Sequence, residues 1–368
     1  IEYPLPRNLR DCRFRLEVKT AWQIDRNPAA ELDYAGIAAD PEKHPNITTE
    51  VRQTPQGPRF FLNGKMVYPA IACVPRNSGP DPMELDFRLL FPVGDWWLSK
   101  DKYDFSAFDL AVEQAFQAYP NVKFFVQLST HPPVSWAKEH PNEMARTEDG
   151  RISRHLGIGE TPHSFSSKIA LEDKRKAVTA CVKYLENSPY ADRIAGYRII
   201  GGHTAEWIGW GHMDKWLFDY SKPAQKAFVE YARISYPEAH IQGIPSVQQR
   251  LKRPNGTESL LDSKENTAEI AYNRFYSVAI ADMLIDLCRT AKKACGGRKA
   301  VGSYYGYTFN TSGSIYFQGT GHYDLMRVLE SGAVDFLMSP QSYGIRHLGE
   351  TMGDMKPFQT IANHGILS

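Results

Sequence analysis

Glu206 stands in a segment whose residue types suit proton transfer. It follows the apolar run 194–200 and two glycines, and it precedes Trp207 and Trp210. Packing against the two indole rings would desolvate the carboxyl group, disfavour its charged form and make it a proton donor near neutral pH. The alternative interpretation is a buried structural glutamate that is paired with one of the many arginines of the chain.

Polar and aromatic side chains follow the other apolar runs of the chain in the same way. Aromatic rings stack on the C–H face of a pyranose, while carboxylate, imidazole and amide groups form hydrogen bonds with its hydroxyls. This combination of residue types predicts a sugar-binding cleft. The residues that we expect to bind the sugar there are Asp95, Trp96, His131, His203, Trp207, Tyr305, Gln341 and Tyr343.

Several of these residues have a structural alternative. Asp95 could cap the helix that follows it, His131 could be a structural histidine on a rigid His-Pro-Pro loop, and the tyrosines could serve packing. His203, His212 and Asp214 lack the spacing of a metal-binding motif and no HExxH is present, so we expect no metal. The sequence also has no GxGxxG, GxxxxGKT, GxSxG or CxxC motif, so we expect no cofactor and no disulfide framework.

From residue 66 onward, short apolar runs alternate with amphipathic patterns, which is typical of parallel strands covered by helices. The runs cover 67–74, 87–93, 122–128, 194–200, 300–305, 334–338 and 365–367, and the helical patterns cover 105–118, 171–185, 224–234, 266–294 and 323–329. Seven strand candidates favour an α/β fold of the (β/α)8 TIM-barrel type over an open doubly wound sheet. In such a barrel, the residues that follow the strands meet at one rim, where we expect the site.

The first 65 residues have a different pattern, which predicts a short β-rich segment before the barrel. Alternation within 10–23 predicts a strand, 27–45 predicts a loop, and 49–54 with 59–62 predicts a hairpin followed by the Asn63-Gly64 turn. We therefore expect a β-rich segment over 1–65 and a barrel over 66–368. The barrel would be incomplete at its C-terminus, with six whole strands and the start of a seventh, as in a piece of a longer polypeptide.

The composition narrows the classes of partner. The 368 residues include 43 Lys+Arg and 42 Asp+Glu, and this formal charge of +1 gives no electrostatic reason to expect a nucleic acid or an anionic membrane. The 42% of apolar and 23% of charged residues are typical of a globular protein, and no run of 18 apolar residues could span a bilayer. We expect a carbohydrate as the partner; the oligomeric state and the compartment stay open.

Three groups of motifs have a familiar order and spacing. The first is Phe87-Arg88-Leu89 with Trp96-Trp97, the second is the stretch 128–133 with Trp136, and the third runs from 195 to Glu206-Trp207. Together they resemble the second, third and fourth strands of β-galactosidase-like glycoside hydrolases of the large retaining (β/α)8 clan. The resemblance covers roughly residues 60–210, and beyond them it extends to the architecture only.

The resemblance implies a role for individual residues. Glu206 would be the general acid/base, and Arg88 would lie beneath the catalytic pair of carboxyl groups, where it would contribute to substrate binding. The clan's nucleophile is a glutamate at the end of the seventh strand. Because that strand is expected at 364–368, we expect the nucleophile just beyond Ser368, with Glu350 as an alternative within the chain.

The sequence also departs from the pattern of the clan. The residue before the acid/base is usually an asparagine that bonds the 2-hydroxyl of the sugar, and here it is Ala205. Either His203 or Gln341 would substitute for it, or the sugar is recognised differently. The leading hypothesis is a retaining glycoside hydrolase that cleaves a β-linked sugar. The alternative is a non-catalytic carbohydrate-binding barrel that has lost hydrolysis.

Overall fold

A parallel sheet forms the centre of the molecule. The structure, a computed structural model, describes residues 12–15, 31–34, 46–73, 85–91, 96–118, 121–153, 160–212, 214–252, 261–309, 319–340 and 355–368. The strands of this sheet are β6 (Ile71–Cys73), β7 (Phe87–Leu90), β10 (Lys123–Ser129), β11 (Ile194–Ile200), β12 (Ala300–Tyr304) and β13 (Phe336–Met338). All neighbours are parallel, and their order in space is their order along the chain. This is the arrangement of consecutive strands in a (β/α)8 barrel.

A seventh strand position begins beside β13. Leu367 forms a parallel bridge with Phe336. Its backbone N–H donates to the Asp335 carbonyl oxygen over 2.9 Å, and its own carbonyl accepts from Leu337 N–H over 2.8 Å. The prediction of an α/β barrel with six strands and the start of a seventh is therefore confirmed for the part of the barrel that the structure describes.

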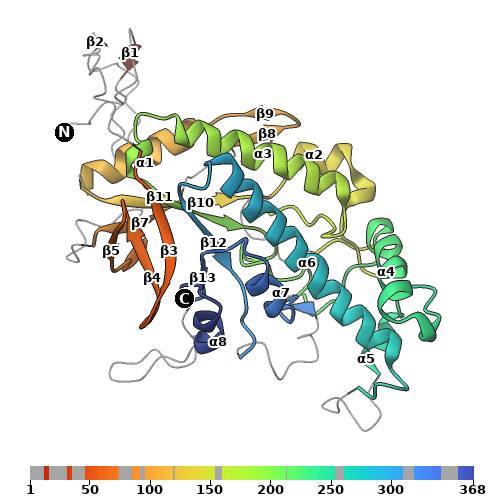
Figure 1. The fold of residues 1–368 in the computed structure, drawn as a ribbon. Helices are drawn as coiled ribbons and strands as arrows, with labels where there is room; N and C mark the ends of the chain where they lie inside the picture. The colour runs from red at the N-terminus through yellow and green to blue at the C-terminus, as the bar shows by residue number, and fades with distance from the viewer. Residues whose placement is uncertain are drawn as a thin grey trace, which may run out of the picture.

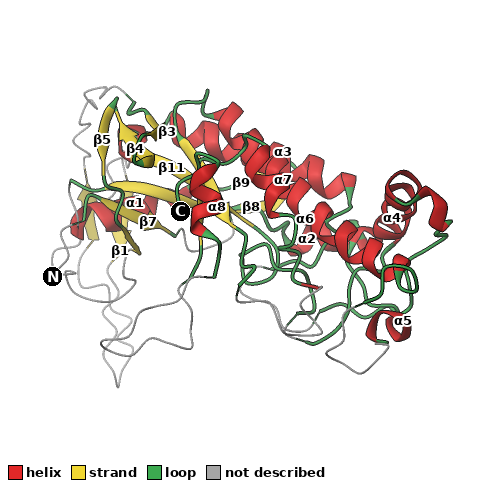
Figure 2. Ribbon diagram, turned by 60° about the horizontal axis from the view of Figure 1, so that its bottom comes forward, coloured by secondary structure: helices red, strands yellow, loops and turns green. Residues whose placement is uncertain are grey.

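Helices cover the outer face of this curled sheet. The longer ones are α1 (Ser106–Ala118), α3 (Lys168–Glu186), α4 (Lys222–Ser235) and α6 (Thr267–Ala294), and the shorter ones are α2 (Val134–Glu139), α5 (Val247–Leu251), α7 (Leu325–Glu330) and α8 (Phe358–Asn363). Figure 1 shows α3 alongside β10 and β11 and α6 running diagonally across the middle of the molecule, and Figure 2 shows α4 and α5 at the side far from the sheet. Among the described residues, no helix has the length and apolarity needed to cross a bilayer.

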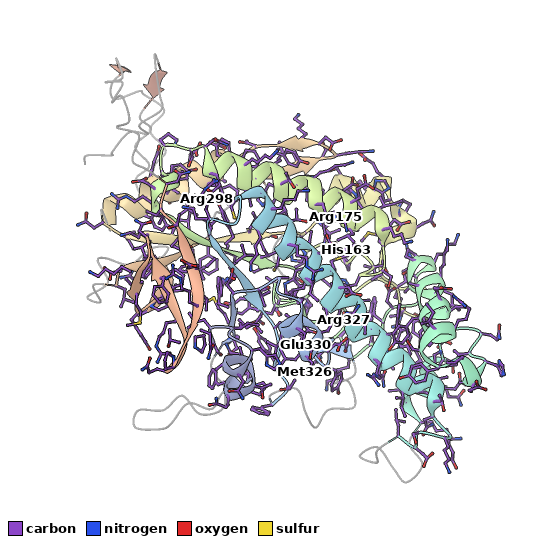
Figure 3. The ribbon with its side chains drawn as sticks, in the orientation of Figure 1. His163, Arg175, Arg298, Met326, Arg327 and Glu330 are labelled. Atoms are coloured by element: carbon purple, nitrogen blue, oxygen red, sulfur yellow. The ribbon has the colours of Figure 1, made fainter. Side chains whose placement is uncertain are left out.

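Two ion pairs join α6 to the helices beside it. Arg175 of α3 donates from Nε to Asp286 over 2.6 Å, and Arg327 of α7 donates from Nε to Asp282 over the same distance. Figure 3 labels both arginines, on either side of α6. Below them the buried side chains of α3 recur every three or four residues, as an amphipathic helix requires. Within the outer layer, α3, α6 and α7 are thus packed as neighbours.

A short antiparallel sheet closes the N-terminal end of the barrel. It consists of β3 (Thr49–Thr54), β4 (Gly57–Leu62) and β5 (Lys65–Val67). Phe60 packs against Phe87 and Phe125 at the start of the barrel strands. The Thr49 hydroxyl donates to the Ala195 carbonyl and accepts from the Ala300 backbone N–H, so β3 is tied to both β11 and β12.

Three sequence-based predictions for this region need correction. The run 67–74 is divided, because Val67 ends β5 and the barrel strand β6 begins only at Ile71. The hairpin turn is shorter than predicted, because Gly57 and Pro58 pair with Thr54 and Gln53 and belong to β4. The stretch 27–45 is not all loop, since β2 (Glu31–Tyr34) pairs with β1 (Cys12–Arg15). In each case the residues that form a strand are determined by the strand with which they pair, and local sequence patterns do not show that partner.

Candidate active site

The candidate site lies at the C-terminal ends of β10, β11 and β12. Thr130 joins the ends of the first two strands, because its backbone N–H and its hydroxyl both donate to the Ile200 carbonyl, over 3.0 and 2.8 Å. Gly201 and Gly202 then let the chain turn sharply. A Cβ on Gly201 would lie 3.0 Å from the Trp207 ring, and one on Gly202 would lie 2.7 Å from the Trp207 Cα. Glycine is required here because Trp207 folds back onto the strand end.

The loop that carries Glu206 is a strained reverse turn. His203 N–H donates to the Ile208 carbonyl over 2.8 Å, which closes the turn at its base. Within it Thr204, Ala205 and Trp207 have φ values of 56°, 63° and 60°, in the left-handed region that residues with a Cβ avoid. Such strain persists only where the surroundings over-determine the conformation, and it is concentrated at functional sites.

Two hydroxyl groups hold the carboxylate of Glu206. Tyr307 donates to Oε1 over 3.0 Å. The Thr204 hydroxyl lies 2.9 Å from Oε2 and 2.7 Å from the His203 carbonyl, and these two acceptors share its single proton. Burial raises the pKa of Glu206 above its ordinary value, while these two hydrogen bonds and the charge of Arg198 act in the opposite direction. The environment therefore favours the protonated acid and also provides partners for the carboxylate that forms when the proton leaves.

His322 connects Glu206 to Tyr307 from below. Its Nδ1 accepts from the Tyr307 backbone N–H over 3.1 Å, so Nε2 carries the proton and donates to the Glu206 carbonyl over 3.0 Å. Burial lowers the pKa of His322 to about 3, which keeps the ring neutral. The neutral imidazole fixes the loop that carries the acid relative to the end of β12.

A buried cation lies inside the barrel under the site. Arg198 of β11 is 1% exposed and donates to the hydroxyl of Tyr304 and to Oε1 of Gln127. Its guanidinium group lies 4.2 Å from the centre of the Tyr304 ring. Arg198 pairs in register with Gln127 of β10, which is two residues beyond Phe125 and therefore on the same face of the strand. Phe125 packs with Phe60 and Phe87 inside the barrel, so Arg198 also lies on the inner face.

Arg88 does not take the place that the resemblance implies. It is fully buried, but its register partner on β10 is Phe124, which packs with α1 on the helix-facing side of the sheet. Leu89 and its partner Phe125 belong to the inner cluster instead. Because neighbours in register share a face, Arg88 points toward the helices, and Arg198 is the arginine that lies inside the barrel.

The predicted histidines are buried beside Trp210. His203 Nδ1 lies 3.0 Å from Oε2 of Glu160, and both side chains are at most 5% exposed. His131 lies on the other loop, with its ring centre 6.0 Å from that of Trp210. Burial, aided by the charge of Lys174, lowers the pKa of His131 to about 3. Both histidines thus lie within the layer that supports the Glu206 loop.

Three of the predicted aromatic residues form part of the core. Trp96, Trp207 and Tyr305 are 4%, 0% and 0% exposed. Trp207 Nε1 donates to the Ser303 hydroxyl over 2.8 Å, and the Tyr305 hydroxyl donates to a backbone carbonyl. A ring with no exposed face offers no stacking surface for a sugar. Trp207 and Tyr305 pack beneath the Glu206 loop, whereas Trp96 packs against Trp97, Tyr103, Phe105 and Phe108. Asp95, Gln341, Tyr343 and the alternative nucleophile Glu350 lie outside the described residues.

Sequence reasoning missed several residues that surround Glu206. Tyr307 belongs to the segment Tyr304-Tyr305-Gly306-Tyr307, which starts at the last residue of β12 and whose tyrosines the sequence favours as packing residues. His322, Glu160 and Arg198 have no such signal, because long loops or the choice of sheet face bring them to the site. Among the described residues, no group of His, Cys, Asp and Glu side chains converges as metal ligands do.

The comparisons with known proteins concern the fold. No model of a protein family matches the sequence, and no curated protein is similar to it. Among solved structures, the β-galactosidase from Bacillus circulans sp. alkalophilus is similar over 71% of this chain and 37% of its own, with 14% identity and a TM-score of 0.50. The catalytic domain of the β-amylase from Paenibacillus polymyxa is similar over 68% of both chains, with 14% identity and a TM-score of 0.51.

The two similar structures share a (β/α)8 architecture with this chain. The chain spans little more than a third of the β-galactosidase and about two thirds of the β-amylase domain. At this level of identity the likeness concerns the fold alone. The chain therefore has the barrel fold of glycoside hydrolases, over part of the barrel.

Proposed function

We propose that this chain is the acid/base-bearing part of a retaining, β-galactosidase-like glycoside hydrolase that cleaves a β-linked sugar. The observation that carries the proposal is the environment of Glu206. A carboxyl group with a raised pKa stands after the fourth barrel strand and accepts hydrogen bonds from Tyr307 and Thr204. The barrel fold, which is similar to that of a β-galactosidase and a β-amylase, is compatible with this chemistry.

The proposed chemistry uses both protonation states of Glu206. The acid donates its proton to the glycosidic oxygen while a second carboxylate attacks the anomeric carbon, so the bond to the leaving group breaks and a glycosyl–enzyme forms. The Glu206 carboxylate then takes a proton from water, and the oxygen of that water displaces the second carboxylate. Burial assists the first step, and the Tyr307 and Thr204 hydroxyls stabilise the anion present between the two.

The second carboxylate belongs, in this proposal, to the seventh strand. That strand starts at Leu367 beside Phe336, and retention requires a carboxyl group about 5–5.5 Å from Glu206. We expect the nucleophilic glutamate just beyond Ser368. Arg198 supports this position, because a buried guanidinium group inside the barrel would stabilise a second negative charge near Glu206.

A second candidate function is carbohydrate binding without hydrolysis. Ala205 favours it, because its methyl group cannot form the hydrogen bond that an asparagine would make to a sugar hydroxyl. A binding barrel would keep the sugar site and need no proton donor. The two candidates differ in one measurable outcome: the hydrolase cleaves a bound glycoside, and the binding barrel leaves it intact.

The deciding experiment measures hydrolysis of aryl β-galactosides by a polypeptide that includes the continuation of the seventh strand. Glu206→Gln should lower the rate about 10²–10⁴-fold for a poor leaving group and much less for 2,4-dinitrophenolate, which departs without a proton. Glu238→Gln, at an exposed position, is the matched control. A wild-type protein that binds the glycosides and hydrolyses none of them would favour the binding barrel.

A further inference from the structure

An apolar groove runs between α3, α4 and α6, and it takes no part in the chemistry at Glu206. Its volume is about 880 Å³. Phe165, Phe275 and Met283 line it as nearly buried side chains, whereas Ile169 and Ile234 line it with 44% and 64% of their surface exposed. Exposed apolar surface with a charged border is characteristic of an interaction site. Figure 1 shows that the three helices belong to the outer layer of the molecule.

The carboxylates that border the groove already have partners. Three of them form ion pairs with arginines that do not line the groove, and one accepts a hydrogen bond from a serine hydroxyl. The pairs are Asp286 with Arg175, Asp282 with Arg327, Glu230 with Arg233, and Glu143 with Ser167. Figure 3 shows Arg175 and Arg327, whose positions flank α6. Arginines within the chain therefore compensate three of the four negative charges of the border, and Glu143 keeps its charge beside the Ser167 hydroxyl.

Three lysines of the same border are free. Lys168, Lys222 and Lys226 are exposed, and among the described residues none of them forms an ion pair or a hydrogen bond. Lys222 and Lys226 are four residues apart on α4 and share a helix face. Lys168 begins α3, where the preceding Ser167 bonds Glu143 of the short helix 141–143 that contacts α4. The three ammonium groups therefore border the same end of the groove.

Two of the helices that form the groove, α3 and α4, begin at this basic end. Lys168 and Lys222 are the first residues of α3 and α4, and the N-terminus of a helix carries a partial positive charge. On α6, Asp282 and Asp286 lie in closed ion pairs and Arg289 donates to the Ser331 carbonyl, so the border has an excess of positive charge, and three of its cations lie together at the lysine end. A ligand that complements it must combine an apolar surface with negative charge at one end.

We propose that this groove binds an amphipathic α-helix of a partner protein, with apolar residues along one face and acidic residues flanking that face at one end. Helix-in-groove recognition uses apolar anchors spaced three or four residues apart, which suits a trough walled by helices. Carboxylates of the partner would meet Lys168, Lys222 and Lys226. A basic helix would be repelled there, and a neutral one would leave the three lysines unpaired.

Reversal of the charges, first on a peptide ligand and then on the groove, tests the proposal. The probes are fluorescent 16-residue helical peptides with a leucine face and either glutamates or lysines at the flanking positions of one end, and binding is followed by anisotropy. The glutamate peptide should bind the wild-type chain at least about tenfold more tightly than the lysine peptide. Lys222→Glu with Lys226→Glu should reverse this preference. The matched control is Lys65→Glu with Lys102→Glu, at exposed strand positions outside the groove.

A second pair of substitutions locates the apolar contact. Ile169→Gln with Ile234→Gln should weaken the glutamate peptide about tenfold or more and leave the helical circular dichroism unchanged, because both side chains are exposed. Equal affinity for the two peptides, no binding of either, or no effect of the α4 charge reversal would overturn the proposal. These measurements involve no glycoside, so they are independent of the proposed hydrolysis.

Discussion

The imidazole of His322 donates a hydrogen bond from Nε2 to the backbone carbonyl of Glu206 over 3.0 Å, across 116 residues of sequence. Its other nitrogen accepts from the Tyr307 backbone, and the Tyr307 hydroxyl in turn reaches the Glu206 carboxylate. A closed circuit of three residues therefore positions the proposed acid/base. The strained turn at 204–207 depends on such contacts, because the local backbone preference opposes it.

Removal of His322 tests whether this circuit holds the turn. His322→Ala should lower the free energy of unfolding by about 2–4 kcal/mol, since it deletes two buried hydrogen bonds and leaves a cavity. Urea denaturation measures the change. His364→Ala, at an exposed histidine, should change the stability by less than about 0.5 kcal/mol. Equal effects of the two substitutions would contradict a positioning role for His322.

The Tyr307 hydroxyl should hold down the pKa of Glu206. Its hydrogen bond favours the charged carboxylate, so Tyr307→Phe should raise the Glu206 pKa further above its ordinary value. Titration of ¹³C-labelled glutamate carboxyl groups by NMR measures the shift. Tyr68→Phe, at a residue 87% exposed, is the matched control. A Glu206 pKa that falls or stays constant in Tyr307→Phe would show that the hydroxyl does not stabilise the anion.

Ala205 stands where an asparagine would fit the backbone better. Asparagine tolerates the left-handed region, where Ala205 has φ 63°, so Ala205→Asn should stabilise the chain by a few tenths to about 1 kcal/mol. Ala180→Asn inside α3 should have the opposite sign, because asparagine is a poorer helix former. Thermal melting of both variants gives the comparison. Destabilisation by Ala205→Asn would mean that packing against the turn outweighs the backbone preference.

Acid should destabilise the fold through its buried neutral histidines. The pKa of His131 is about 3 in the folded chain, below its ordinary 6.5, so between these pH values the unfolded chain binds a proton that the folded chain does not. This contribution to stability is complete above pH 6.5 and is lost as the pH falls toward 3. His131→Leu removes it, so the stability of the variant relative to wild type should improve by about 2 kcal/mol from pH 7 to pH 5.

Urea denaturation at the two pH values measures that change. The control is Met66→Leu, at an exposed residue that does not titrate, which should give a stability difference from wild type that is independent of pH. A constant difference for His131→Leu as well would show that the ring is protonated in the folded chain.

Much of the barrel could be predicted from local patterns, and β11 shows why. Its seven residues are all buried, so the run 194–200, which is apolar except for Arg198, and the strand have the same bounds. β6 was harder to predict, because the run 67–74 supplies one strand to the hairpin and another to the barrel. The placement of Glu206 after β11 agrees with the prediction because it depends only on where that strand ends.

The surroundings of Glu206 depend on relations that no local pattern contains. Arg88 and Arg198 both stand in apolar strands, and only the register with β10 decides which of them faces the inside of the barrel. The indole of Trp207 could have faced a ligand, but the turn folds it over Ser303 instead. Aromatic residues after strands therefore predict the rim of a barrel better than they predict which rings are accessible.

The hydrogen bonds of the Thr49 hydroxyl limit how early the N-terminal hairpin can complete its contacts during synthesis on the ribosome. The hydroxyl bonds backbone groups of Ala195 and Ala300, and the second contact spans 251 residues. At roughly 5–20 residues per second, residue 300 emerges about 10–50 s after residue 49. During that interval Phe60 can meet Phe87 and Phe125 once β7 and β10 have been made, but β12 is still missing. The hairpin therefore cannot complete its contacts until β12 has been made, and part of its apolar side stays uncovered until then.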